Sequence, residues 1–216
     1  PSVLMGIDQL PSDLNRISPI GTMFTSMFMH GVFMHLIGNM LYMWIFADNI
    51  EDALGHKKFI IFYLISGVGA AMSQILMDTS SQIPMVGASG AIGGVLGAYL
   101  IMYPRAKIWV FMWIVFIVRL ITVPAFIVLG IWMGLQLINV IDQGQSGVAY
   151  SAHIGGFIGG ALIGYSLVPK LTNTYLNYHL NPLERWLTPF QRIIVGLIAW
   201  GTISLVAIKI GNNGII

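Results

Sequence analysis

Hydrophobic residues dominate this chain in long stretches, which polar and charged residues interrupt only at intervals. A helix that crosses a bilayer needs about 20 mostly apolar residues, and six stretches approach that length. They run from about 31 to 47, 59 to 77, 85 to 103, 123 to 141, 148 to 168 and 193 to 210. The pattern therefore predicts an all-α polytopic membrane protein with about six transmembrane helices.

The segments between and around these stretches predict how the chain is organised. The apolar run IWVFMWIVFIV, at 108–118, is too short to span and is followed by Arg119 and Pro124, so we expect an interfacial or re-entrant piece. The first 20 residues combine three prolines with charged residues and lack an apolar core. We expect an outer-face N-terminal loop at 1–30, a helical core at 31–168, a cytoplasmic linker at 169–192 and an additional C-terminal transmembrane helix at 193–216.

Composition supports the membrane assignment and excludes some chemistry. Hydrophobic residues make up 56% of the 216 residues and charged residues 8%, whereas soluble domains are about one quarter charged. Because the chain contains no cysteine, it has neither disulfides nor a thiolate metal site. The intramembrane histidines have no carboxylate or thiolate beside them, so we expect no metal, and we also expect no other cofactor and no nucleic-acid partner.

The basic residues predict the orientation in the membrane. If all six stretches span, eight of the ten Lys and Arg residues fall on one side: Lys57, Lys58, Arg105, Lys107, Arg119, Lys170, Arg185 and Arg192. The other side holds Arg16 and Lys209. Loops rich in Lys and Arg stay in the cytoplasm, so we expect the N-terminus of this chain outside.

Polar residues inside spans are costly and are functional candidates by default. Ser89 and His153 each lie four or five residues from the outer end of their predicted helices, which corresponds to about 6–8 Å of depth. His35 lies at a similar depth, and Asn39 follows it at i+4 on the same helix face. Three helices thus place a hydroxyl, two imidazoles and an amide in one outer layer.

Glycines predict which of these helices touch. Gly90 and Gly94 follow the serine, and Gly155, Gly156 and Gly159 follow the histidine. Small residues at such spacing allow two helix backbones to approach closely in lipid. The helices that carry Ser89 and His153 are therefore expected to pack against each other.

Each of these residues also has a simpler explanation. A lone serine or histidine in a membrane helix more often packs, or bonds a neighbouring helix, than performs catalysis. The shared depth, the shared side and the paired glycines favour a joint role. A histidine beside a serine can take its proton and return it to a leaving amine, and no acidic residue lies inside a span. The residues therefore indicate a Ser/His dyad, with His35, Asn39 and the Ser89 backbone N–H as donors of suitable type for an oxyanion.

Three motifs in this order and spacing resemble the rhomboid intramembrane serine proteases of bacterial type: HGVFMHLIGNM, GASGAIGG and AHIGG. The resemblance covers about residues 20–168 and implies an integral protein of a bacterial inner membrane. It implies that Ser89 is the nucleophile, that His153 is the base and that His35 and Asn39 serve the oxyanion hole. His30 matches a further family histidine near the site, and the resemblance implies that it supports the site.

The sequence departs from that family in three places. A transmembrane helix that usually precedes the outer loop is missing from this chain, and the loop reads SPIGTMFTS without the common Trp-Arg pair. In some members an aromatic residue four positions after the serine packs on the imidazole, and here that position is Gly93. The stretch 193–210 is an extra span that some members also have.

Three functions are compatible with this pattern. The leading one is a serine endopeptidase that cleaves transmembrane protein substrates near the outer face, through a water-filled cavity with the helix at 123–141 as lateral entry. The second is a non-catalytic rhomboid-fold subunit of a larger membrane complex. The third, a channel or transporter for small solutes, fits less well because no ionisable relay continues into the inner half.

Overall fold

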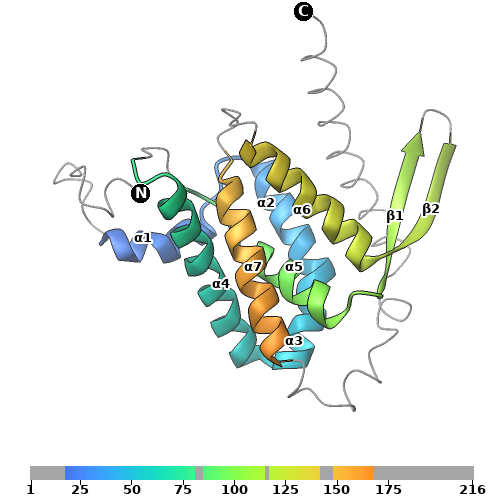
Figure 1. Cartoon of the computed structure of the whole chain (residues 1–216), viewed down its shortest axis with the longest axis horizontal. Coiled ribbons are helices and arrows are strands. Elements are labelled where there is room, and N and C mark those ends of the chain that lie inside the picture. Colours follow the sequence, from blue (N-terminus) through green and yellow to red (C-terminus); the bar gives the residue numbers. More distant parts are fainter. Residues whose placement is uncertain (1–17, 81–84, 115–116, 142–147, 168–216) are drawn as a thin grey trace, which may run out of the picture.

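The computed structural model describes residues 18–80, 85–114, 117–141 and 148–167 (Figure 1). Its helices are α1 (Pro19–Thr25), α2 (Phe33–Tyr42), α3 (Asp48–Leu54), α4 (His56–Met77), α5 (Ser89–Met102), α6 (Ala125–Ile141) and α7 (Tyr150–Leu167), with a 3-10 turn, η1 (Ser26–Phe28), and a π-helical turn, η2 (Met43–Ala47). Two strands, β1 (Lys107–Ile114) and β2 (Ile117–Pro124), lie between α5 and α6. The expected linker and C-terminal helix lie outside the described residues.

Part of the expected N-terminal loop is helical. Ser18 caps α1 by accepting a hydrogen bond from the Gly21 N–H, and Pro19 occupies the first turn, where its missing N–H costs nothing. Met23 and Met27 are buried, and a methyl group added at Gly67 of α4 would collide with the Met27 sulfur. Residues 19–28 are therefore helical and not part of the loop expected over 1–30, because apolar side chains on one face of this segment pack against α4.

The first predicted span continues beyond its expected end at Ala47. The π-helical turn η2 connects α2 directly to α3, so helical backbone extends to Leu54 despite the acidic residues of α3. Gly55 then ends it with φ of +77°, a conformation that favours glycine, and α4 begins at the next residue. Acidic residues at a membrane surface can sit on a helix that continues past the bilayer, so they did not mark its end.

Helices α4, α5 and α7 pack against one another and form the centre of the bundle. Methyl groups added at Gly156 and Gly160 of α7 would collide with the backbone oxygens of Gly90 and Gly94 of α5. The two helices therefore touch backbone to backbone along a seam in which only glycine fits. The core around this seam includes Val95, Leu96 and Tyr99, all fully buried.

The glycines named from the sequence do not all serve this seam. A methyl group at Gly90 or Gly94 would press on Ala70 or Ser66 of α4, and one at Gly155 would collide with Ser73 of the same helix. At Gly159 it would meet no described atom within 4 Å. The structure thus corrects the expectation for Gly159, which lies on the helix face turned away from its described neighbours.

Helix α5 is shorter than predicted and begins at Ser89 itself. Figure 1 shows that it starts part-way along the bundle, below the ends of α4 and α7. The expectation that Ser89 lies four residues inside its helix is therefore wrong, although the serine still lies below the bundle end. Residues 85–88 lead to it as non-helical chain, and Gly87 adopts a φ of +117°.

The short apolar run at 108–118 belongs to an antiparallel hairpin, in which Lys107 pairs with Pro124 and Ile114 with Ile117. Its Val, Ile, Phe and Trp residues favour strands, and an unbroken apolar run has no periodicity that separates strand from helix. The Ala125 N–H donates to the Ala106 oxygen (2.8 Å) and ties the hairpin base to the start of α6. The piece expected to be interfacial or re-entrant is therefore a β-hairpin, in a described fold that is otherwise helical.

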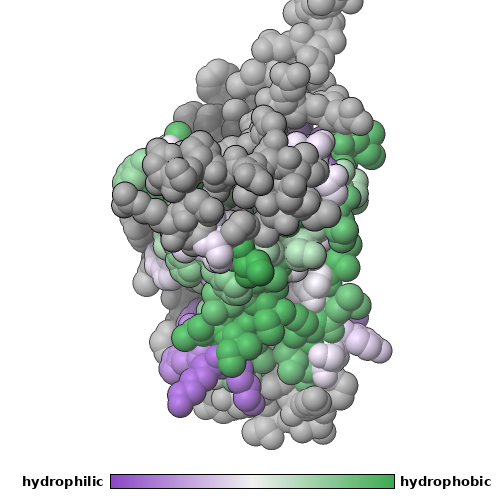
Figure 2. All heavy atoms as spheres, turned by 90° about the vertical axis from the view of Figure 1, so that its left-hand side faces the viewer, coloured by the Kyte–Doolittle hydropathy of each residue, from purple (hydrophilic) through white to green (hydrophobic). Residues whose placement is uncertain are grey.

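Large apolar side chains also cover the outside of the bundle. Figure 2 shows an apolar surface on the side where α4 lies, with hydrophilic side chains gathered at the lower end. Among the described residues, α4 is the one helix that is by itself long and apolar enough to cross a membrane. The pair Ile20–Phe28 and Phe33–Leu54, bent by 88°, passes the same test together, and α5 and α6 are shorter apolar helices.

Candidate active site

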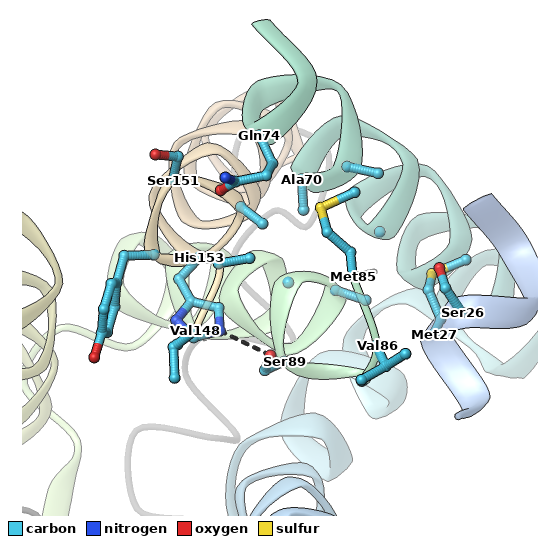
Figure 3. A pocket seen from close by; sticks show the side chains of 18 of the residues that line it. Ser26, Met27, Ala70, Gln74, Met85, Val86, Ser89, Val148, Ser151 and His153 are labelled. Atoms are coloured by element: carbon cyan, nitrogen blue, oxygen red, sulfur yellow. Dashed lines mark hydrogen bonds between the residues drawn. The ribbon is translucent and has the colours of Figure 1, made fainter. Parts of the chain in front are cut away.

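Ser89 and His153 face each other across the glycine seam of α5 and α7. His153 lies in the first turn of α7, and its Nε2 is 2.7 Å from the Ser89 Oγ (Figure 3). The seam brings the two helix backbones together just below these side chains, which is why a hydroxyl and an imidazole 64 residues apart can form a hydrogen bond. This is the geometry that a serine nucleophile and a general base require.

A cavity of about 940 Å³ opens beside this pair. The end of α4, the chain before Ser89, the end of α6 and the start of α7 surround it. Its polar lining comprises Ser26, His35, Gln74, Asp78, Ser89, Asn139, Tyr150, Ser151 and His153. Polar side chains from η1, α2, α4, α5, α6 and α7 thus gather at this end of the bundle, which is a suitable setting for water.

His35 and Asn39 of α2 approach the chain just before the serine. A methyl group built at Gly87 would lie 2.5 Å from Cε1 and 2.9 Å from Nε2 of His35, and 3.6 Å from Nδ2 of Asn39. The buried Asn39 amide donates from Nδ2 to Nε2 of His30 (2.8 Å), and the His30 and His35 rings lie edge to face with centroids 5.2 Å apart. The structure therefore places His35 and Asn39 against the chain that precedes Ser89, and His30 against these two side chains.

Turnover is expected to be sensitive to substitution of Gly87, in the chain just before Ser89. We expect Gly87→Ala to lower turnover at Ser89 by about 10-fold or more, because a side chain is strained at φ +117° and its Cβ would displace His35. The measurement is kcat on a transmembrane substrate, with Gly38→Ala as the control. Gly38 lies in α2 and has no described atom within 4 Å of an added methyl group. Equal kcat for Gly87→Ala and the native chain would contradict this expectation.

Two residues of α6 also contact the histidine, and sequence reasoning missed both. Gln136 is 8% exposed, and its Oε1 lies 2.8 Å from Nδ1 of His153. The Trp132 ring lies one turn earlier, 6.0 Å from the imidazole between centroids, and Tyr150 approaches the imidazole edge to face at 6.2 Å. An amide inside an otherwise apolar helix was a sequence signal that could have identified Gln136.

The close approach of the α7 backbone accounts for Gly93. A methyl group at Gly93 would lie 2.8 Å from the His153 carbonyl oxygen, so no larger residue fits there without moving α7. The aromatic neighbour of the imidazole instead comes from α6, where Trp132 also stacks on Phe157. An aromatic contact is therefore present, supplied by a different helix.

Comparison with known families identifies the family to which this chain belongs. Residues 19–170 match the model of the rhomboid domain, which is well over half of the chain. The chain belongs to the rhomboid family. This match confirms the rhomboid family and the helical membrane fold that the sequence predicted. The chain is therefore an integral membrane protein.

Curated rhomboid relatives come from several lineages. The chain is 28% identical over 183 residues to rhomboid protein 1, mitochondrial, of Saccharomyces cerevisiae, an alignment that covers 80% of this chain and 47% of the yeast protein. It is 30% identical over 152 residues to RHOMBOID-like protein 5 of Arabidopsis thaliana (69% and 44%) and 29% identical over 167 residues to rhomboid-like protease 5 of Toxoplasma gondii (72% and 18%). The chain thus spans less than half the length of each of these relatives.

Proposed function

We propose that this rhomboid-family chain is an intramembrane serine endopeptidase that cleaves transmembrane protein substrates near the outer membrane face. The observation that carries the proposal is the 2.7 Å contact between Ser89 Oγ and His153 Nε2, formed at the edge of a polar cavity. The name of the Toxoplasma relative, a rhomboid-like protease, agrees with it.

The chemistry follows from the two side chains. The Ser89 oxygen attacks the carbonyl carbon of a substrate peptide bond while its proton passes to Nε2 of His153. The tetrahedral intermediate collapses when His153 gives that proton to the departing amine, which leaves an ester on Ser89. A water molecule from the cavity then attacks the ester, His153 takes its proton, and the serine oxygen regains a proton as the carboxylic acid departs.

The negative charge on the tetrahedral oxygen has donors on two sides. Ser89 is the first residue of α5, so its backbone N–H has no partner inside the helix and lies at the positive end of the helix dipole. From α2, the His35 ring and the second Nδ2 hydrogen of Asn39 approach the same loop. We propose that these groups form the oxyanion hole, with His30 orienting the Asn39 amide.

Asn39 provides a test of this oxyanion role. We expect Asn39→Ala to lower kcat by roughly 10²-fold with little change in KM, because the lost donor acts on charge that develops only in the transition state. Steady-state kinetics in proteoliposomes measure both parameters. A rise in KM alone would assign Asn39 to substrate binding or helix packing instead.

The cavity end of the bundle is proposed to face outward. It lies opposite the starts of α4 and of the hairpin, which carry Lys57, Lys58 and Lys107, and basic residues favour the cytoplasmic side. Helix α6 is proposed as the wall through which a substrate enters, since a methyl group added at Gly130 or Gly134 would meet no atom of the described residues within 4 Å. The bacterial inner membrane stays a prediction, and the yeast relative is named mitochondrial.

The deciding experiment is covalent labelling. The chain, purified and reconstituted in liposomes, should react with a fluorophosphonate probe at Ser89 and should cleave a model transmembrane protein. Heat-denatured protein and Ser89→Ala should not be labelled. A folded chain that neither reacts nor cleaves would favour the non-catalytic subunit of a larger membrane complex.

A further inference from the structure

Gln136 occupies the side of the His153 ring opposite Ser89. Its Oε1 lies 2.8 Å from Nδ1, while the Ser89 Oγ lies 2.7 Å from Nε2 of the same ring. We propose that Gln136 is a positioning residue that holds His153 in the tautomer able to act as a base. This inference rests on the proposed protease function and adds a third member to the Ser/His pair.

A second hydrogen bond fixes which atom of the Gln136 amide faces the histidine. The Gln136 Nε2 donates to the backbone oxygen of Trp132, at 3.2 Å. If the amide were rotated by half a turn, its oxygen would face that carbonyl oxygen, and two acceptors would oppose each other. The Trp132 carbonyl therefore keeps Oε1 directed at Nδ1.

This orientation determines where the imidazole carries its hydrogen. An amide oxygen can only accept, so Nδ1 must be the protonated nitrogen of the neutral ring. Nε2 then has a free lone pair and accepts the hydrogen bond from the Ser89 hydroxyl. In the other tautomer Nε2–H would donate to the serine oxygen and could not take its proton, so His153 would be inactive as a base.

The burial of Gln136 favours its hydrogen bond with Nδ1 of His153. Gln136 is buried, so its amide oxygen is shielded from bulk water, and leaving that oxygen without a donor would be disfavoured. A carboxylate could accept the same hydrogen bond, as in soluble serine proteases, but a charge inside the bilayer is costly. A neutral amide supplies the acceptor without that cost.

The residue belongs to the helix proposed as the entry wall. Gln136 and Trp132 both lie on α6, and both contact the His153 ring. The base is therefore correctly set only while α6 is packed against α7. An outward movement of α6 that admits a substrate must be reversed before His153 can accept the serine proton.

The tautomer can be measured directly. Nitrogen NMR of the full chain in bilayers, labelled at its histidine ring nitrogens, should show Nδ1 protonated and Nε2 unprotonated for His153, assigned by comparison with His153→Asn. In Gln136→Met, which keeps the length of the side chain and removes the acceptor, we expect the Nδ1–H signal to be lost. An unchanged His153 spectrum in Gln136→Met would overturn the inference.

Kinetics supply the functional test. Gln136→Met should lower kcat by about 10- to 100-fold at unchanged KM, and Gln136→Glu, which keeps an acceptor oxygen, should retain more turnover than Gln136→Met although its carboxyl group is costly in the membrane. Leu137→Met, a lipid-exposed neighbour on α6, is the matched control and should keep native kcat. Native kcat in Gln136→Met would mean that Gln136 only packs.

The two readouts separate this inference from the proposed function. If the native chain cleaves nothing but its His153 tautomer still depends on Gln136, the protease proposal fails and the positioning role stands. If the native chain cleaves substrate and Gln136→Met neither slows it nor changes the tautomer, the positioning role fails alone.

Discussion

Ser89→Ala is expected to abolish cleavage of a transmembrane substrate, lowering kcat by at least about 10⁴-fold, while the protein stays folded and inserted. The hydroxyl that contacts His153 at 2.7 Å is the proposed nucleophile, and its oxygen is the atom that would form the ester. His153→Ala should be equally severe, and the double variant should be little worse than either single one, because the two side chains act as a unit. Cleavage assays with reconstituted protein measure all three variants.

A distant serine provides the control for this prediction. Ser166 lies near the far end of α7, is exposed and donates only to the Ile163 oxygen, so Ser166→Ala should keep native turnover. Thermal unfolding of each variant checks that the losses are not caused by misfolding. Turnover by Ser89→Ala close to the native value would refute the serine protease proposal.

Gly160→Ala is expected to have the largest effect on stability. Its new methyl group would collide with Gly94 backbone atoms on α5, which cannot move as a flexible side chain can. We expect the free energy of unfolding to fall by about 3 kcal/mol, a value at the upper end for overpacked cores. Activity should fall as well, since α5 and α7 carry Ser89 and His153. Unfolding midpoints in detergent and turnover measure the two effects.

Gly159 is the matched control, one residue away on the same helix. A methyl group there meets no described atom within 4 Å, so Gly159→Ala should leave activity unchanged and raise stability by about 0.5–1 kcal/mol, because alanine loses less backbone entropy in a helix. Equal destabilisation by the two substitutions would contradict the proposed seam between α5 and α7.

The hydrophobic pattern located most helices but not all of their boundaries. Predicted starts and ends for α4, α6 and α7 fall within three residues of the structure. The pattern missed the continuation to Leu54, because acidic residues marked a polar surface and not a helix end. It also left 108–118 as an interfacial or re-entrant piece and did not identify the hairpin at 107–124, because an unbroken apolar run fits either a strand or a helix.

The sequence by itself determined the membrane class, the family and the residues around which a site could form. Ser89, His153, His35 and Asn39 stand out because polar groups are rare in apolar helices. Only the tertiary structure decided that Gln136 meets Nδ1 of His153, that Trp132 covers the ring and that Gly160, not Gly159, lies against Gly94. The reason is physical: in a bilayer, lipid and helix neighbours are both apolar, so hydrophobicity along the chain does not reveal which face of a helix packs against protein.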